Sequence, residues 1–584
     1  MQRLRINLGV PFIKPYTTPR PDMNKDYCID LFNYKRRTTR EVTIGGVALG
    51  GGNEIRLQSM TNTNTLDTDG SVAQIKRIAD AGGDLVRLTA QGVKEAENLE
   101  NIHEKLRSEG YTTPLVADIH FNPKAAEEAA KHVEKVRINP GNFSKNPEET
   151  EEKLKKLIDI CNEHKTALRI GVNHGSLAQH VMDKYGDTPQ GMAESAMEYL
   201  RLCHKLGFDN VVVSMKASNT MVMVESVRIL CAMMMDEGMN YPLHLGVTEA
   251  GNGEDGRIKS AAGIGALLAD GIGDTIRVSL SEAPEKEIPV AKKLADYFKE
   301  RETADGISAN DCGKFNPFSY SRRKTTAVRN IGGENVPVVI TNCGDTFAEP
   351  QPDYTSIKQM KEAGVNAIET DLKSALSCWD ALCTEARKEN SVIIINSTGK
   401  NSTGEYRAII HRLESENIAA PVILKKTYNE DELESLQVKA AADMGVMFID
   451  GMADGIMIEN ASEKIAPEDV KNLSFGILQA TRARITKTEY ISCPGCGRTL
   501  YDLENTITQI KERTKHLKGL KIGIMGCIVN GPGEMADADY GYVGAGVGKV
   551  SLYKRKECVE KNIPTDQAVD KLIALIKSNG DWKE

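Results

Sequence analysis

Three cysteines and a glutamate near the C-terminus have residue types and a spacing that suit a metal or iron–sulfur site. Cys493 and Cys496 form a C-x2-C pair across Pro-Gly, and Cys527 begins a segment that ends in Gly-Pro-Gly-Glu534. A C-x2-C pair brings two sulfurs to one metal or cluster because the residues between them turn tightly, and a distant third cysteine completes the face. A cluster held by three thiolates and one oxygen ligand would keep one iron that a substrate could reach.

A structural zinc ribbon is the alternative for these cysteines, because C-x2-C pairs also occur commonly in zinc sites. Such a ribbon normally adds a second C-x2-C or a spaced Cys/His pair, whereas this region offers Cys558 and His516. The spacing therefore favours an iron–sulfur cluster over zinc. The Gly-Pro-Gly turn would carry Glu534 back towards Cys527 as the fourth ligand, although Glu534 could also be an ordinary turn residue.

A second group of polar residues lies between positions 87 and 279, where each ends a short apolar run. Five of them are cationic and would bind a strongly anionic ligand such as phosphate or diphosphate if they converged. These are Arg87, Arg137, Arg169, Lys216 and Arg277. Four others could face the same ligand, namely Asp118, Asn139, Asn173 and Ser279. Any single cation could instead pair with a carboxylate inside the fold, but five around one rim favour the ligand interpretation.

Glu249 and His120 are the candidates for proton transfer, because each stands where a strand-like run meets a loop and within reach of the same ligand. Either residue alone is more typical of a structural hydrogen-bonding partner. The neighbouring cations favour the catalytic interpretation.

These residues need a scaffold that brings the ends of many strands together. From residue 40 to 304, eight strand-like runs alternate with helix-like runs, which predicts a parallel sheet with crossover helices. Eight such units make a (β/α)8 TIM barrel, in which the active site lies at the C-terminal ends of the strands. The expected strands are Ile55–Thr61, Leu85–Ala90, Pro114–His120, Lys135–Gly141, Ala167–Asn173, Asn210–Lys216, Pro242–Glu249 and Thr275–Ser281.

Residues 305–487 are predicted to form an inserted second α/β domain that is barrel-like, after a polar linker at Arg301–Arg329. The strands of this insert do not end in a set of cations like that of the first unit, so we expect the insert to be mainly a structural spacer. Its expected strands are Val336–Thr341, Asn366–Asp371, Val392–Ser397, Pro421–Lys425, Val446–Asp450 and Ile456–Glu459. Residues 488–584 are expected to form a small α+β domain that carries the cysteines, and residues 1–39 an N-terminal extension.

The composition narrows the class of protein. The 584 residues are 40% apolar and 27% charged, which is typical of a soluble globular protein, and the net charge of −8 argues against a general nucleic-acid binder. No apolar run is long and uncharged enough to span a bilayer, and the N-terminus lacks the apolar core of a secretory signal. The 12 cysteines lie mostly in apolar segments, which indicates reduced thiols and a cytoplasmic location.

Nine segments taken together resemble the 4-hydroxy-3-methylbut-2-enyl diphosphate synthase family. The resemblance is dense over about residues 40–300 and 488–550. It rests on Gln58–Thr63, Pro114–His120, Arg137–Asn142, Arg169–Asn173, Ser214–Ser218, Thr248–Gly251, Gly271–Arg277, Cys493–Cys496 and Gly526–Glu534. The insert separates this chain from the shorter two-domain form, so the chain resembles the three-domain form.

The resemblance implies the reductive ring opening of 2-C-methyl-D-erythritol 2,4-cyclodiphosphate in the methylerythritol phosphate route to isoprenoids, in which two electrons enter and water leaves. It implies a [4Fe–4S] cluster on Cys493, Cys496, Cys527 and Glu534, with Glu534 displaced by a substrate oxygen. The five cations would hold the diphosphate, and Glu249, with or without His120, would assist protonation of the departing hydroxyl. Flavodoxin or ferredoxin would supply the electrons.

The cysteine domain can act only if it docks on the barrel rim. The resemblance implies a homodimer for the shorter form, with this contact between subunits, whereas the insert leaves contact within one chain or between chains open. Two other functions also stay open. One is a phosphate-ligand barrel lyase or transferase with a structural zinc domain, and the other is a non-enzymatic iron–sulfur carrier that binds anions.

Overall fold

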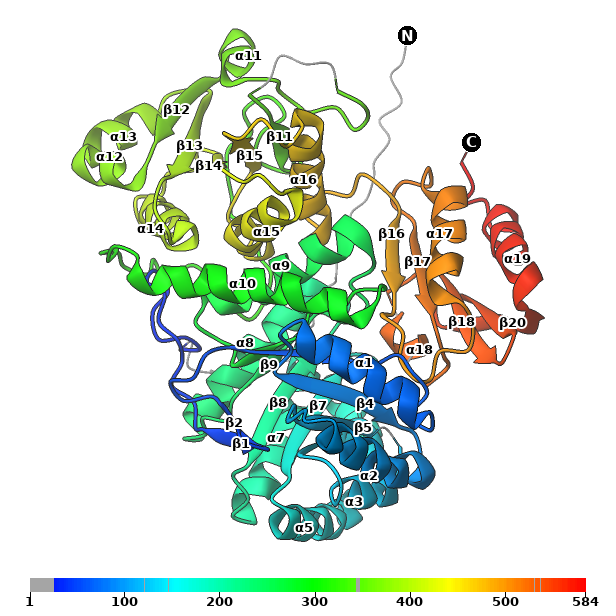
Figure 1. The fold of residues 1–584 in the computed structure, drawn as a ribbon. Helices are drawn as coiled ribbons and strands as arrows, with labels where there is room; N and C mark the ends of the chain where they lie inside the picture. The colour runs from blue at the N-terminus through cyan, green and yellow to red at the C-terminus, as the bar shows by residue number, and fades with distance from the viewer. Residues whose placement is uncertain are drawn as a thin grey trace.

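The computed structural model describes residues 26–119, 121–144, 146–342, 347–529, 531–535 and 537–583. They form a barrel, an inserted α/β unit and a C-terminal α+β unit, coloured in chain order in Figure 1. In that view the insert lies above the barrel, and the C-terminal unit lies to the right of both. None of the described helices has the length and apolar character needed to cross a membrane. His120 and most of the expected N-terminal extension fall outside the described residues.

The first unit is the parallel eight-stranded barrel that the alternating runs predicted. The strands follow the order β8-β7-β6-β5-β4-β3-β10-β9, and an isolated parallel bridge between Val213 and Leu243 joins the two ends of the sheet. Every expected barrel strand contains one observed strand. These are β3 (Arg56–Met60), β4 (Leu85–Ala90), β5 (Leu115–Ile119), β6 (Lys135–Ile138), β7 (Ala167–Asn173), β8 (Val211–Lys216), β9 (His244–Leu245) and β10 (Thr275–Ile276).

Short polar residues start several of the helices that surround the barrel. Asp67, Asn122, Asn146 and Asn219 each accept a hydrogen bond from a main-chain N–H of the first turn, which satisfies a donor that the helix itself cannot. The helices are α1 (Thr68–Asp80), α2 (Val93–Ser108), α3 (Pro123–Ala129), α4 (Pro140–Phe143), α5 (Pro147–His164), α6 (Gln179–Tyr185), α7 (Pro189–Lys205), α8 (Thr220–Asp236), α9 (Gly253–Ala269) and α10 (Glu287–Glu300).

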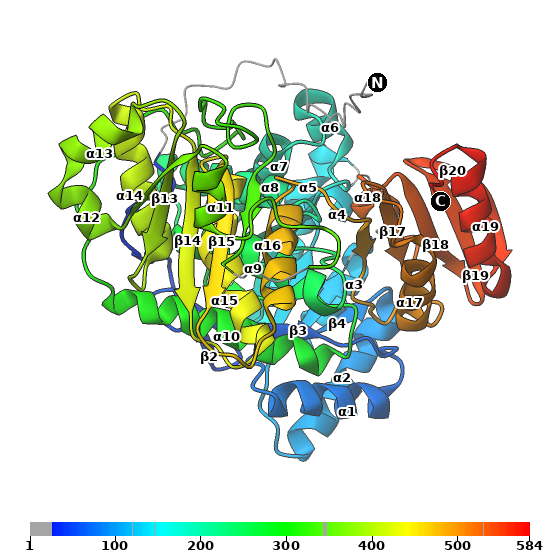
Figure 2. The same cartoon turned by 90° about the horizontal axis from the view of Figure 1, so that it is seen from above.

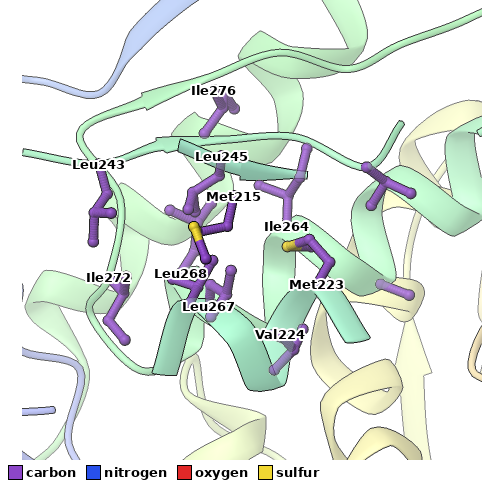
Figure 3. Close-up of a cluster of buried hydrophobic side chains, with 14 of the residues drawn as sticks. Met215, Met223, Val224, Leu243, Leu245, Ile264, Leu267, Leu268, Ile272 and Ile276 are labelled. Atoms are coloured by element: carbon purple, nitrogen blue, oxygen red, sulfur yellow. The ribbon is translucent and has the colours of Figure 1, made fainter. Parts of the chain in front are cut away.

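Apolar side chains pack between the strands and helices of the barrel and close the end at which the strands begin. Figure 3 shows Met215 of β8, Leu245 of β9 and Ile264 of α9 among the buried side chains packed between strands and helices. At the N-terminal ends of the strands, the hairpin of β1 (Val42–Ile44) and β2 (Val47–Leu49) packs on the first apolar residues of the barrel strands. The opposite end, where the strands finish, is the end left for a site.

The insert contains five parallel strands in the order β11-β15-β14-β13-β12. As in a barrel, its first strand pairs with its last, but β11 and β12 are not joined, so the sheet is an open part of a barrel. Its elements are β11 (Val338–Ile340), α11 (Ile357–Glu362), β12 (Asn366–Thr370), α12 (Leu372–Ser377), α13 (Trp379–Ala386), β13 (Ser391–Ser397), α14 (Ser402–Ser415), β14 (Val422–Tyr428), α15 (Leu433–Ile449), β15 (Gly455–Asn460) and α16 (Pro467–Ala480).

The prediction of one strand in the insert is wrong. Val446–Asp450 forms the end of α15 and its C-cap, where the helix is buried on nearly every side. A helix that is apolar all round loses the 3.6-residue periodicity that would distinguish it from a buried strand. The other five expected strands of the insert correspond to β11 through β15.

Small residues bring α9 of the barrel and α15 of the insert into close contact. A Cβ added to Gly265 would lie 2.9 Å from the Cα of Ala442, and one added to Gly445 would lie 2.8 Å from the Cβ of Ala262. The two helices therefore approach as closely as their backbones allow. Figure 2 shows β14, β15 and α15 on one side of α9, and the C-terminal unit on the other side.

A buried ring of four charges also joins these two units. Arg228 of the barrel pairs with Asp270 at 2.9 Å and with Asp450 of the insert at 2.6 Å, while Arg407 of the insert pairs with the same two carboxylates at 2.8 and 3.1 Å. Each charge has one partner of opposite sign in its own unit and one across the interface. Separation of the insert from the barrel would break the two pairs that cross the interface, which opposes separation.

The insert repeats part of the barrel, a relation that the sequence-based prediction missed. Arg37 donates from its main-chain N–H to the carbonyl of Gly271 at 2.8 Å, and its guanidinium donates to two further barrel carbonyls. Arg323 donates in the same way to Gly451 at 2.8 Å and to two carbonyls of the insert. The flanking sequences match, Tyr-Lys-Arg-Arg-Thr at 34–38 against Tyr-Ser-Arg-Arg-Lys at 320–324. This part of the stretch interpreted as a linker is therefore packed against the insert.

The C-terminal unit is a mixed five-stranded sheet in the order β16-β17-β18-β19-β20. The first three strands are parallel and the last two continue antiparallel. The cysteine loops follow β16 and β17, so both emerge at the same edge of the sheet. Its elements are β16 (Glu489–Ser492), α17 (Leu503–Thr514), β17 (Lys521–Met525), α18 (Gly531–Glu534), β18 (Tyr540–Gly546), β19 (Lys549–Lys554), β20 (Glu557–Pro564) and α19 (Thr565–Ser578).

Candidate active site

The ends of the barrel strands and the cysteine loops of the C-terminal unit line one cavity of about 70 Å³. Both halves belong to the same chain. The barrel contributes Met60, Arg87, Asp118, Arg137, Arg169, Asn173, Lys216, Thr248, Glu249, Arg277 and Ser279. The C-terminal unit contributes Cys493, Pro494, Gly495, Cys496, Arg498, Met525, Gly526, Cys527, Gly531 and Glu534.

Hydrogen bonds and a close approach of two backbones hold the C-terminal unit on the barrel rim. Ala250, which follows β9, forms a parallel bridge with Ser492 at the end of β16, and Ser281 Oγ donates to the carbonyl of Cys493 at 2.8 Å. Gly175 has a φ of +81°, and a Cβ there would lie 2.4 Å from the carbonyl oxygen of Gly533. Only glycine fits that backbone at so close an approach. The structure therefore places the contact that the sequence left open within one chain.

The five predicted cations converge on the barrel side of this cavity. Alternation along each strand points residues two apart to the same face, so Arg169 and Asn173 of β7 share the interior with Gly171 between them. A Cβ on Gly171 would lie 2.3 Å from Nε of Arg137, so this glycine gives the arginine its room. Arg137 donates to the carbonyl of Gly171 at 2.8 Å and to Oδ1 of Asn173 at 2.9 Å.

The five cations Arg87, Arg137, Arg169, Lys216 and Arg277 form a cation ring, and carboxylates neutralise only part of its positive charge. Asp118 accepts from Arg137 at 3.0 Å and lies 3.6 Å from Arg87, and Glu287 accepts twice from Arg277 at 3.0 Å. Lys216 forms no ion pair with any residue that the structure describes. Nη1 of Arg169 is buried and has no hydrogen-bond partner among those residues.

The cations of the ring repel one another, and this repulsion adds to the effect of burial on their pKa values. Burial, and then the neighbouring Arg169, lower the pKa of Lys216 well below its ordinary value. Burial also lowers the pKa of Arg87 to about 10, despite the opposing effect of Asp118. An anion with several oxygens would relieve this repulsion and satisfy the unpaired donors. The ring therefore suits an anion that carries several oxygens.

Glu249 stands between the two halves in a strained conformation. Its backbone φ is +49°, a value that residues other than glycine rarely adopt, and Glu249 is only 3% exposed. Burial raises its pKa well above the ordinary value, and the adjacent carboxylate of Glu534 raises it further. These surroundings therefore favour the protonated form of Glu249. Backbone strain of this kind persists where the surroundings enforce it, as at active sites.

Glu534 reaches the cavity from the end of α18 and contacts the barrel directly. Asn173 Nδ2 donates to its Oε1 at 2.8 Å, and Ser218 Oγ donates to its main-chain carbonyl at 3.2 Å. The sequence allowed Glu534 to be an ordinary turn residue. In the structure it lies in the same cavity as Cys493, Cys496 and Cys527.

The three cysteines sit in loops that are themselves braced by hydrogen bonds. Gly526 N–H donates to Sγ of Cys493 at 3.2 Å, and Cys496 N–H donates to Oγ1 of Thr499 at 3.0 Å. Burial raises the pKa of the Cys493 thiol well above its ordinary value. A bound cation would reverse this by favouring the thiolate.

The ligand atoms of the cysteines and Glu534 are not gathered as closely as one zinc ion would hold them. A zinc ion 2.3 Å from each sulfur would draw tetrahedral sulfurs to about 3.8 Å from one another. Within the part of the chain that the structure describes, three ligand atoms lie within 4.8 Å of one another only at Asp311, Cys312 and His411, away from the cavity lining. Three thiolates and a carboxylate around one cavity, too widely spaced for one ion, are a donor set that fits a multi-iron cluster.

Two predicted site residues are not seen in the cavity. Asn139 is buried beside it, but its Oδ1 caps α4 by accepting from Gly141 N–H at 3.1 Å, and its Nδ2 donates to Ser176 Oγ at 2.9 Å. His120 lies outside the described residues. The remaining predicted residues of both halves all line the cavity.

The sequence reasoning missed Arg498, Met60 and Thr248, which also line the cavity. Arg498 lies two residues after Cys496, and its Nη2 lies 3.6 Å from Oδ2 of Asp118. Its position beside a ligand cysteine was a usable signal, because the loop that carries the ligand must also carry its neighbours into the site. Met60 places its sulfur 3.0 Å from Nε of Arg87.

Comparisons with known proteins match both ends of the chain to one family. Residues 39–292 match the GcpE TIM-barrel domain, and residues 489–578 match the GcpE protein C-terminal domain. A relative from Phocaeicola vulgatus is 56% identical over 95% of this chain and 100% of its own length. Relatives from Porphyromonas gingivalis and Leptospira interrogans are 52% and 41% identical, over 95% and 96% of this chain and 100% and 99% of their own lengths. All three carry the name 4-hydroxy-3-methylbut-2-en-1-yl diphosphate synthase (flavodoxin).

Proposed function

This chain belongs to the GcpE family of 4-hydroxy-3-methylbut-2-enyl diphosphate synthases, and from that premise we propose how its own residues carry the family's reaction. The reaction is the reductive ring opening of 2-C-methyl-D-erythritol 2,4-cyclodiphosphate in the methylerythritol phosphate pathway. Two electrons enter and one water leaves. The observation that supports the assignment of residues is the single cavity shared by the ring of cations and the cysteine loops.

The cation ring binds the diphosphate of the substrate. Arg169 has a buried donor that no described residue occupies, and Lys216 has no ion pair among the described residues, so both contact the phosphate oxygens directly. Asn173 orients Arg137 for the same task. Arg87 and Arg277 complete the ring, with Ser279 as a further donor. Asp118 keeps two of the arginines in place, and preorganised donors of this kind favour the charge that develops on the leaving oxygen.

Cys493, Cys496, Cys527 and Glu534 hold the cofactor, which we assign as a [4Fe–4S] cluster. When bound, such a cluster supplies the electrons and a Lewis-acidic iron. Glu534 is suited to be the ligand that gives way to substrate, because a carboxylate binds iron less tightly than a thiolate. Asn173 can hold the released carboxylate, since it already donates to Glu534 at 2.8 Å.

Glu249 is the proton donor. It is buried and lies in the cavity between the ring and the cysteine loops, and its pKa is raised by burial and by Glu534. A general acid must carry its proton at the working pH, and a raised pKa favours that state. His120 remains a second candidate from the sequence.

Flavodoxin is the proposed electron donor, because the names of the similar proteins specify it, and ferredoxin is the alternative. One chain contains both halves of the site, so we propose that catalysis needs no second subunit, whether or not the protein forms a homodimer. The free thiols among the described cysteines support a cytoplasmic location.

We keep the domain limits expected from the sequence, with the barrel at 40–304, the insert at 305–487 and the cluster domain at 488–584. The insert acts as a rigid support, because α16 leads directly into β16 of the cluster domain while α15 is locked to α9. Point substitutions in the insert that abolished turnover without altering fold or cluster content would contradict this role.

Anaerobic purification with iron and sulfide analysis, followed by turnover of the cyclic diphosphate with a chemical reductant, tests the proposal. Iron and sulfide in about a four-to-four ratio with turnover would support it. Zinc in place of iron would favour a lyase or transferase with a structural zinc domain. A cluster without turnover would favour an iron–sulfur carrier.

A further inference from the structure

Arg498 is the one cation that the described part of the cluster domain places in the cavity. It follows Cys496 by two residues, yet its guanidinium points across the domain boundary, with Nη2 3.6 Å from Oδ2 of Asp118 on β5. The side chain is 8% exposed, and no described residue hydrogen-bonds to its buried Nε. A long cationic side chain buried with a free donor is costly unless its position has a use.

Asp118 is the meeting point of three guanidinium groups. Arg137 donates to Oδ1 at 3.0 Å, and Arg87 and Arg498 each lie 3.6 Å from Oδ2. Arg87 and Arg137 come from the barrel, whereas Arg498 arrives only when the cluster domain is docked. Docking therefore changes the charge that surrounds Asp118 and, through it, the two barrel arginines.

On the side of the cluster domain, Arg498 shares the cavity with the ligand cysteines Cys493, Cys496 and Cys527. Arg498 thus lies beside the ligand sulfurs and also beside Asp118 of the cation ring. A fixed positive charge near cluster sulfurs favours the reduced cluster, which carries one more negative charge.

We propose that Arg498 is a positioning residue that couples the two halves of the site, since its guanidinium lies between the ligand cysteines and the Asp118 end of the cation ring. It has two effects. It makes the cluster easier to reduce, and it holds Asp118 and the two barrel arginines in the arrangement that binds diphosphate. This inference rests on the proposed function, because it assumes a cluster on the cysteines and a diphosphate on the ring.

Arg498→Gln and Arg498→Lys, compared with the control Arg513→Gln, test the proposal. Arg513 lies on α17 of the same domain, and its ion pair with Asp570 is exposed, so its loss should change nothing in the cavity. The measurements are the iron and sulfide content, the midpoint reduction potential of the cluster without substrate, and KM and kcat for the cyclic diphosphate.

Arg498→Gln is expected to shift the midpoint potential to a more negative value and to raise KM about 10- to 100-fold, the effect of losing a charged hydrogen-bonding group from a buried site. Arg498→Lys should keep most of the potential, because it keeps the charge, but should still raise KM because it lacks the planar fork. A Gln variant with full cluster content whose potential and KM equal those of the wild type would overturn the proposal.

If Arg498→Gln loses its cluster, the Lys variant decides the question, and a wild-type KM in Arg498→Lys with its cluster intact would overturn the proposal. A double-mutant cycle with Asp118→Asn tests the coupling, and effects on KM that simply multiply would contradict it. Failure of the proposed function would look different, because the wild type itself would then lack iron or turnover.

Discussion

Replacement of Lys216 by methionine should stabilise the free protein while it weakens ligand binding. Lys216 is 5% exposed, has no ion pair among the described residues, and is repelled by the arginines around it. Exchanging a buried, unpaired charge for an apolar side chain of similar length should add about 1–2 kcal/mol to the free energy of unfolding.

The sign of the pH dependence follows from the lowered pKa of Lys216. Because the unfolded chain binds the lysine proton more tightly than the folded protein, Lys216 costs stability wherever the unfolded lysine is protonated. That cost shrinks as the pH rises through the folded pKa towards the ordinary lysine value. The stability gained by Lys216→Met should therefore be greatest at pH values below the lowered pKa of Lys216, and should decline as the pH rises from there towards the ordinary lysine value.

Ligand binding should change in the opposite direction. Loss of one charge-assisted hydrogen bond to a phosphate costs about 1.5–3 kcal/mol, which corresponds to about a 10- to 100-fold weaker affinity. Titration calorimetry with inorganic diphosphate measures the affinity, and thermal melting without ligand compares the stabilities.

Lys471→Met is the matched control for this experiment. Lys471 is as buried as Lys216, but it donates to the carbonyl of Ala348 and to Glu468, both at 2.7 Å. Its replacement should lower the melting temperature and leave diphosphate binding unchanged. A Lys216→Met protein that melts earlier than the wild type and binds diphosphate equally well would refute the reasoning.

Three further predictions concern the acid, the ligands and the insert. Glu249→Gln should lower kcat about 100-fold with iron content unchanged; the wild-type kcat should fall as the pH rises past the raised pKa of Glu249, and an unchanged kcat in the variant would exclude this residue as the acid. Cys527→Ser should lose iron and sulfide on anaerobic purification while Cys558→Ser retains both, and the reverse pattern would reassign the third ligand. Gly445→Val should lower the urea midpoint, because overpacking between α9 and α15 costs about 1–3 kcal/mol; Gly306→Val, with open space at its Cβ, is the control, and equal midpoints would contradict the close packing.

The sequence predicted the barrel well because its strands are short apolar runs bounded by loops, a pattern that survives without tertiary information. The same logic failed at Val446–Asp450, because α15 is buried between α9 and the insert sheet and carries no polar face to mark its period. The paired segments at 34–38 and 320–324 were visible in the sequence as a repeat. Their meaning became clear only when both were seen to pack beneath a parallel sheet.

Some residues of the candidate site could also be predicted from the sequence, and others could not. Arg87, Arg169 and Lys216 could be proposed from strand ends, because the topology of a barrel fixes where such residues point. Asn139 has the same kind of position but caps α4. The position of Arg498 beside Cys496 could have indicated that it enters the site, but its contact with Asp118 could not be predicted, because that contact depends on docking between parts of the chain far apart in sequence.

The central claim is that one chain supplies both halves of the active site. Coexpression of a Lys216→Met chain with a Cys527→Ser chain tests it directly, because each chain lacks a different half. If the site forms within one chain, the mixture should show no more turnover than the two variants prepared separately. Turnover restored well above that sum would mean that the barrel of one chain works with the cluster domain of another, and would contradict the claim.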